Sequence, residues 1–166
     1  MKASKTIGRL VTAMTILVAG LVVSAGPASA QSGTANYENV GNPGWCLDGN
    51  GVRAYLHRCG GVYQTWQFSD GSRQFTMKQI QTGACLTSAG YLGASVYLAT
   101  CNGGLAQLWN AWGTNGWVVF QMAVNPGECM RPTGTEIPGK DAYDLILSTC
   151  PEDVSNVPNI YAWRYH

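Results

Sequence analysis

The chain has 166 residues, with ten Lys and Arg against nine Asp and Glu, and a formal net charge of +1 at pH 7. Three of the basic residues lie in the first 30 positions, so the other 136 residues carry seven basic and nine acidic residues. That part has no basic excess with which to neutralise phosphates, which argues against a nucleic-acid partner. Its length suffices for one domain with a hydrophobic core.

Residues 1–30 are predicted to form a secretory signal peptide. A basic start is followed by an uncharged apolar run over residues 10–23 and by the small-residue sequence Ala28-Ser29-Ala30. This order is typical of a leader that is removed on export, and the apolar run is short for a membrane span. We therefore expect cleavage near Ala30 and a secreted domain of residues 31–166 without a membrane span.

Three copies of one unit of about 40 residues follow. Each copy contains a strand-like stretch, a Gly-x-Cys motif followed by Leu or Met, an alternating segment that leads into a second cysteine, and a tryptophan. The strand-like stretches are residues 37–40, 75–80 and 117–124, and the motifs contain Cys46, Cys85 and Cys129. The alternating segments carry apolar residues five and three positions before the second cysteine, at Ala54 and Leu56, Val96 and Leu98, and Leu145 and Leu147.

Alternation with period two predicts strands that bury one face, and no helical periodicity extends over any length. The pattern therefore predicts an all-β domain made of three repeats, at about residues 37–74, 75–116 and 117–166. Gly, Asn, Asp and Pro lie between the strand-like stretches, as expected for short strands joined by turns.

All six cysteines lie in the predicted secreted part, and an even count in a secreted chain indicates three disulfides. The internal repeat favours pairing within each unit: Cys46–Cys59, Cys85–Cys101 and Cys129–Cys150. Each bridge is expected to stabilise the fold by roughly 3 kcal/mol. A zinc site is not expected, because the chain has no CxxC motif and only two histidines, His57 and His166.

These repeats, with Gly-x-Cys-Leu, a second cysteine and a closing Q-x-W, resemble the ricin B-type β-trefoil lectins. Two Q-x-W sequences are intact, Gln64-Thr65-Trp66 and Gln107-Leu108-Trp109, while the third copy has Tyr161 in place of Gln before Trp163. The resemblance covers residues 37–163. It implies a β-trefoil of twelve strands, in which a six-stranded barrel is closed by three hairpins. It also implies that Trp66, Trp109 and Trp163 are core residues rather than ligand contacts.

The resemblance further implies a shallow sugar pocket, potentially one in each unit. The family's pocket uses an Asp two residues after the first cysteine, a ring two residues before the second, the Q-x-W Gln and the residue before that Gln. The first unit offers Asp48, His57, Gln64 and, in place of the usual Asn, Tyr63. The second unit retains only Gln107, and the third retains no element.

At most one sugar site is therefore expected, in the first unit. A carboxylate accepts charge-assisted hydrogen bonds from sugar hydroxyls, and a ring covers the apolar C–H face of the sugar. The alternative for Asp48 is a turn role, because Asp before Gly commonly caps a turn by bonding its own backbone.

The expected function is a secreted carbohydrate-binding protein that is not an enzyme and needs no metal or cofactor. Galactose-type sugars are favoured as ligands, with xylan or mannose possible. The alternative is a β-trefoil scaffold for protein–protein interaction, resembling an inhibitor or a toxin subunit, with decayed sugar sites. A hydrolase has little support: Glu152 and Asp153 are adjacent, whereas a glycosidase needs two carboxylates facing each other across the scissile bond.

Overall fold

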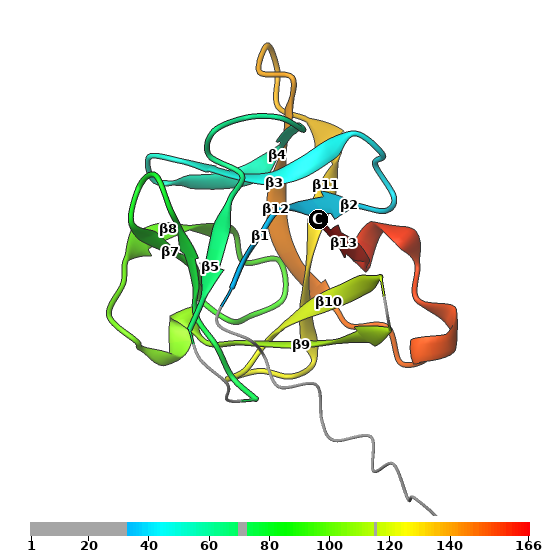
Figure 1. The fold of residues 1–166 in the computed structure, drawn as a ribbon. Helices are drawn as coiled ribbons and strands as arrows, with labels where there is room; N and C mark the ends of the chain where they lie inside the picture. Colours follow the sequence, from blue (N-terminus) through cyan, green and yellow to red (C-terminus); the bar gives the residue numbers. More distant parts are fainter. Residues whose placement is uncertain (1–32, 70–72, 115) are drawn as a thin grey trace, which may run out of the picture.

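Short antiparallel strands make up most of the regular structure in the computed structural model, which describes residues 33–69, 73–114 and 116–166 (Figure 1). The predicted signal peptide lies outside the described residues. The described strands are β1 (Thr34–Ala35), β2 (Tyr37–Asn39), β3 (Trp45–Asn50), β4 (Arg53–Arg58), β5 (Trp66–Phe68), β6 (Met77–Gln79), β7 (Ala84–Ser88), β8 (Val96–Thr100), β9 (Trp109–Thr114), β10 (Trp117–Met122), β11 (Glu128–Glu136), β12 (Ala142–Thr149) and β13 (Trp163–Tyr165). Three short 3-10 helices accompany them: η1 (Leu105–Gln107), η2 (Val154–Asn156) and η3 (Asn159–Tyr161).

Twelve of these strands form three groups of four, β2–β5, β6–β9 and β10–β13, as the β-trefoil prediction requires. The fourth strand of each group pairs with the first strand of the next, in the pairs β5–β6, β9–β10 and β13–β2. The last of these pairs returns the end of the chain to its beginning and closes the barrel. The middle strands form the three hairpins β3–β4, β7–β8 and β11–β12. The all-β trefoil is therefore confirmed.

One strand exceeds the expected twelve. β1 precedes the first repeat and pairs with β5 through Thr34–Gln67 and Ala35–Trp66. It occupies the edge of β5 opposite β6, where backbone N–H and C=O groups would otherwise be unpaired.

The predicted disulfides and the predicted core are both confirmed. The bridges are Cys46–Cys59, Cys85–Cys101 and Cys129–Cys150, each within one repeat. The apolar residues of the alternating segments are buried, and the three repeat tryptophans are fully buried at the centre of the core. Because β5, β9 and β13 each begin at one of these tryptophans, the closing motif of every repeat anchors a barrel strand in the interior.

The tryptophan side chains are held differently in the third repeat. The indole Nε1 of Trp66 donates to the Leu47 carbonyl at 3.0 Å, and that of Trp109 donates to the Leu86 carbonyl at 3.0 Å. Trp163 Nε1 is buried without a hydrogen-bond partner in the described structure. The third repeat therefore lacks one bond that the first two share.

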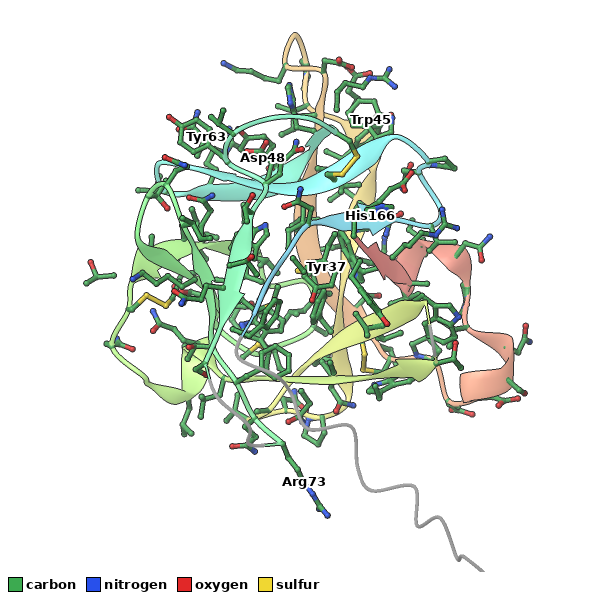
Figure 2. The ribbon with its side chains drawn as sticks, viewed as in Figure 1. Tyr37, Trp45, Asp48, Tyr63, Arg73 and His166 are labelled. Atoms are coloured by element: carbon green, nitrogen blue, oxygen red, sulfur yellow. A yellow bond between two sulfur atoms is a disulfide. The ribbon has the colours of Figure 1, made fainter. Side chains whose placement is uncertain are left out.

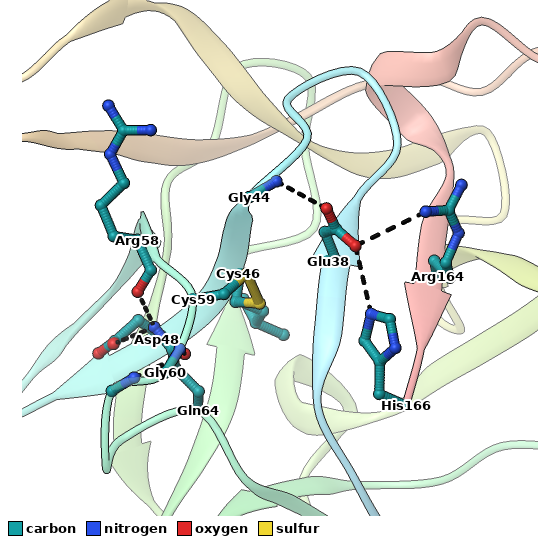
Figure 3. Close-up of a disulfide and its surroundings, with 12 residues drawn as sticks. Glu38, Gly44, Cys46, Asp48, Arg58, Cys59, Gly60, Gln64, Arg164 and His166 are labelled. Carbon is teal, nitrogen blue, oxygen red and sulfur yellow. Dashed lines mark hydrogen bonds and ion pairs between the residues drawn. A yellow bond between two sulfur atoms is a disulfide. The ribbon is translucent and has the colours of Figure 1, made fainter.

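Glu38 in β2 links the start of the domain to its last strand (Figure 3). Its Oε1 accepts from the backbone N–H of Gly44 at 2.6 Å. Its Oε2 lies 3.7 Å from Arg164 Nη1 and 3.2 Å from His166 Nε2. Together, the Gly44 hydrogen bond, the His166 contact and the Arg164 charge lower the pKa of the Glu38 carboxyl, outweighing the effect of its burial. The carboxylate thus stabilises the closure of the barrel while it is ionised.

The third hairpin is longer than the other two and breaks the threefold symmetry. β11 has nine residues and β12 has eight, and the tip of this hairpin projects beyond β3 and β4 (Figure 1). β12 continues alongside β4 through the pairs Ala142–His57, Tyr143–Leu56 and Asp144–Tyr55. The third repeat therefore lies directly beside the candidate site of the first.

Candidate functional site

In the β3–β4 hairpin, alternate side chains point into the core, and the others lie on the outer face of the hairpin. Leu47 and Leu56 are paired across the hairpin and fully buried in the core. Since side chains alternate along a strand, the paired residues Asp48 and Tyr55 lie on the opposite, outer face, and His57 follows on the same face of β4. The hairpin register thus brings together a carboxylate and two rings.

Asp48 is a strand residue and not a turn residue, so the turn alternative is wrong. The turn of this hairpin is Gly51–Val52, where Gly51 has φ +66°. Gly49, which follows Asp48, serves packing instead: a Cβ there would lie 2.9 Å from Cη2 of Trp66. The Asp48 side chain, only 3% exposed, bonds Gln64 rather than its own backbone.

Gln64 is the hub of a buried hydrogen-bond network around Asp48 (Figure 3). Its Nε2 donates to Asp48 Oδ2 at 3.0 Å and to the Arg58 carbonyl at 2.8 Å. Its Oε1 accepts from the N–H groups of Gly60 at 2.8 Å and Gly61 at 3.0 Å. An amide has two donors and two lone pairs on its oxygen, so this side chain has its full set of partners. Gln64 therefore positions Asp48 and fastens the loop that follows β4.

The two carboxylate oxygens of Asp48, Oδ1 and Oδ2, differ in their hydrogen bonding. Oδ1 is buried and has no hydrogen-bond partner of good geometry among the described residues, although the Tyr55 phenol forms a hydrogen bond with the Asp48 carboxylate. No described Lys, Arg or His forms an ion pair with Asp48. Burying a carboxylate without a full set of partners is costly, so this arrangement is not explained by stability.

Tyr55 is the site residue that the sequence analysis missed. It is paired with Asp48 across the hairpin, and its ring centroid lies 6.2 Å from that of His57 with the two ring planes perpendicular. Burial raises the pKa of the Tyr55 phenol to about 12, and both the charge of the Asp48 carboxylate and a hydrogen bond to it act in the same direction. The available signal was the alternation itself: with Ala54 and Leu56 inward, Tyr55 had to point outward beside His57.

Tyr63 joins this group from the loop after β4. Its carbonyl accepts from the Gly49 N–H at 3.0 Å, which fixes the loop beside Asp48, and its side chain is half-buried. The Tyr63 phenol also contributes to the raised pKa of Tyr55, so the two phenols are neighbours. Figure 2 shows Tyr63 and Asp48 in the same part of the molecule. The structure thus brings together Asp48, Tyr63 and Gln64 with Tyr55.

An open hollow of about 210 Å³ lies beside this group, between β4 and the tip of the third hairpin. It is lined by Asn50, Arg53, Tyr55, His57, Ile137, Lys140 and Ala142. The sequence predicted a pocket at Asp48 itself, whereas in the structure the carboxylate is covered and the open space borders Tyr55 and His57. The hollow also includes third-repeat residues, which no motif in the first repeat could reveal.

The equivalent positions in the other repeats are satisfied internally. In the second, the Thr87 hydroxyl donates to the Cys85 carbonyl at 2.8 Å and accepts from Gln107 Nε2 at 3.2 Å. In the third, Tyr161 in the Gln position donates its phenol to Ser148 at 3.1 Å. Neither of these two positions has a buried oxygen without a partner, although Glu128 Oε2, elsewhere in the third repeat, is also buried without one.

Two other features of the described residues bear on function. They contain no cluster of three or more His, Cys, Asp or Glu suited to a metal ion, and none of their helices has the length and apolarity to cross a membrane. Asp153, one of the two adjacent acids near the C-terminus, caps η2 by accepting from the N–H of Ser155 at 2.8 Å. It therefore serves a local structural role.

Comparison with known proteins agrees with this fold. Residues 34–156 match the family model of the ricin-type β-trefoil lectin domain. The chain belongs to this family. No curated protein sequence matches this ricin-type domain.

Several solved structures share the fold of this ricin-type domain. A ricin B-like lectin from Macrolepiota procera in complex with lactose has a TM-score of 0.64 and 15% identity, over 82% of this chain and 96% of that one. The Rhizoctonia solani agglutinin has a TM-score of 0.63 and 16% identity, over 84% and 98%. A mosquitocidal holotoxin has a TM-score of 0.67 and 13% identity, over 82% of this chain but only 17% of the toxin. At these identities the likeness is one of fold.

Proposed function

We propose that this ricin-type domain binds carbohydrate through a single site in its first repeat, formed by Asp48, Tyr55, His57 and Tyr63. Gln64 positions the carboxylate of Asp48. The observation that carries the proposal is Asp48 Oδ1, which is buried beside two rings and has no partner of good geometry among the described residues. Sugar hydroxyls are donors that would supply the missing hydrogen bond to Oδ1. The lactose complex of a fungal relative with this fold is in keeping with such a ligand.

The chemistry follows from the geometry of the outer face. A sugar hydroxyl donates a charge-assisted hydrogen bond to Oδ1, while Oδ2 stays on Gln64. The ring of His57 covers the C–H face of the sugar. Oδ1 is shielded from solvent, so a tyrosine side chain at the site rotates aside when the sugar binds. Side-chain rotamer changes of this size are common at binding interfaces.

The ligand is a glycan or polysaccharide, with galactose-type sugars first and xylan or mannose as the alternatives. The protein acts outside the cell, and it binds without catalysing a reaction. One shallow site per chain gives a modest affinity, with a Kd near ~1 mM corresponding to about 4 kcal/mol. Useful avidity then depends on a multivalent surface.

The test is an NMR titration of the isotope-labelled protein with galactose, lactose, xylose oligomers and mannose. Saturable shifts at Asp48, Tyr55 and His57 are expected with at least one of these sugars. They should vanish in Asp48→Ala and persist in the matched control Thr87→Ala, which changes the same position of the second repeat. Absence of saturable shifts with every sugar, in a protein that is folded, would refute the proposal.

A second candidate function is a scaffold that binds another protein, and an exposed apolar group favours it. Tyr91 and Leu92, at the tip of the β7–β8 hairpin, are 63% and 61% exposed. Val124 is 48% exposed and is adjacent, because Asn125 donates to the Gly90 carbonyl at 3.0 Å. Exposed apolar groups of this kind mark interaction surfaces. A purified stoichiometric complex that is lost in Leu92→Asp, together with no sugar binding, would establish this function instead.

A further inference from the structure

We infer that the hollow between β4 and the third hairpin holds an acidic group, a carboxylate or sulfate carried by the glycan. This inference rests on the proposed sugar site, which shares Tyr55 and His57 with the hollow. It adds a substrate class: an oligosaccharide whose neutral sugar lies at Asp48 and whose acidic substituent lies on the third repeat.

The lining of the hollow is rich in donors and has no carboxylate. Arg53 and Lys140 are cationic, and Asn50, Tyr55 and His57 carry further N–H or O–H groups. Within the described residues, Lys140 has no ion-pair partner. Its ammonium group is therefore available to an anionic ligand.

Two of the acidic residues near the hollow are paired with arginines. Asp144 Oδ1 lies 3.2 Å from Arg53 Nη2, and Asp141 Oδ2 lies 3.5 Å from Arg58 Nε. The Arg53 side chain remains about half exposed, so its other N–H groups still face solvent. Lys140 is left without an ion-pair partner at the rim of the hollow, and among the described acidic residues beside the hollow Glu136 and the buried Asp48 have none either.

The wall that carries Lys140 is held in place by contacts between repeats. Tyr143 packs edge-on against Trp45, with ring centroids 4.8 Å apart, and the Arg58 guanidinium lies 4.1 Å above the Trp45 ring. The backbone pairs between β12 and β4 add to these contacts. A wall fixed before binding lowers the entropic cost of holding a ligand.

The size of the hollow and the charge of Asp48 define the orientation of the ligand. About 210 Å³ is below the range of roughly 300–1,000 Å³ typical of drug-sized ligands, and it suits one sugar residue or its substituent. The buried charge of Asp48 repels an anion, so the acidic group lies away from Asp48. Only a glycan with its acid toward Lys140 satisfies both.

The experiment compares neutral and acidic forms of the same glycan on the full protein. The probes are lactose against lactose sulfated on its galactose, and xylotriose against xylotriose with a glucuronic acid branch. At low salt we expect the acidic form to bind about twofold to fivefold more tightly, the range for an exposed charge pair. About 0.5 M NaCl should remove most of this preference, because it screens exposed charges.

Lys140→Gln should abolish the preference for the acidic form and leave binding of the neutral form unchanged. The matched control is Lys78→Gln, on β6 and outside the hollow, which should keep the preference. Equal binding of neutral and acidic forms would overturn the inference while the proposed function stands. A preference that survives in Lys140→Gln would also overturn it. If neither form binds, the proposed function fails and the inference fails with it.

Discussion

Replacing Asp48 with threonine should make the protein more stable and, at the same time, unable to bind sugar. The second repeat shows why, since it already has Thr87 at the equivalent position with both hydrogen bonds of its hydroxyl satisfied. In Asp48→Thr the new hydroxyl has the equivalent partners, Gln64 Nε2 and the carbonyl two residues upstream. The substitution therefore replaces a buried charge, held by Gln64 and by the Tyr55 phenol, by a neutral group that has two partners of its own.

The magnitude follows from the unpartnered oxygen. A buried polar group left without a hydrogen bond costs about 1–3 kcal/mol, and more when it is charged. Part of this gain is lost, because the threonine side chain is shorter than that of aspartate, which leaves some space beside Tyr55 and removes the acceptor of its phenol. We expect a net gain of about 1 kcal/mol in the free energy of unfolding, or about 3 °C in Tm for a domain of this size.

The assay is urea and thermal unfolding with the disulfides intact, run beside the sugar titration. The reciprocal variant Thr87→Asp is the control, and it should lose at least about 2 kcal/mol, because it buries a charge where the existing hydrogen bonds are complete. If Asp48→Thr instead loses more than about 1 kcal/mol, the Asp48 carboxylate stabilises the fold. Its unpartnered oxygen would then not mark a ligand site.

Three further predictions concern the scaffold. Trp66→Phe should cost about 1 kcal/mol more than Trp163→Phe in urea unfolding, because only Trp66 Nε1 has a hydrogen-bond partner to lose; equal costs would contradict this. The lowered pKa of Glu38, due first to the Gly44 N–H, gives stability that is present above the ordinary Glu pKa and lost as pH falls through the lowered value. Unfolding of Glu38→Gln should therefore depend less on pH in the acid range than that of the wild type, and an unchanged dependence would exclude this role. Replacing the Cys129–Cys150 pair by alanines should cost roughly 3 kcal/mol in calorimetry, whereas a cost near zero would show that this bridge constrains little.

The repeat of short local patterns determined the fold. Alternating apolar residues before each second cysteine predict the buried rows of the hairpins, and the recurrent cysteines and tryptophans predict the disulfides and the core. These signals are readable because strand alternation is local and because three copies of one unit must bury equivalent side chains. The sequence also marked Asp48, since only the first repeat combines a carboxylate with a ring and the Gln.

The tertiary structure decided what surrounds Asp48. Whether a carboxylate is open or covered depends on side-chain packing, and here Gln64 and the loop to Tyr63 close over it. The hollow beside it joins β4 to Lys140, more than eighty positions away in the sequence, through an elongated hairpin that the other repeats lack. The wider cysteine spacing of the third repeat, 21 positions against 13 in the first, hinted at a longer hairpin. The pairing of β12 with β4 is what positions this longer hairpin beside the site. The sequence could not reveal that pairing, because contacts between distant segments leave no periodic pattern in the chain.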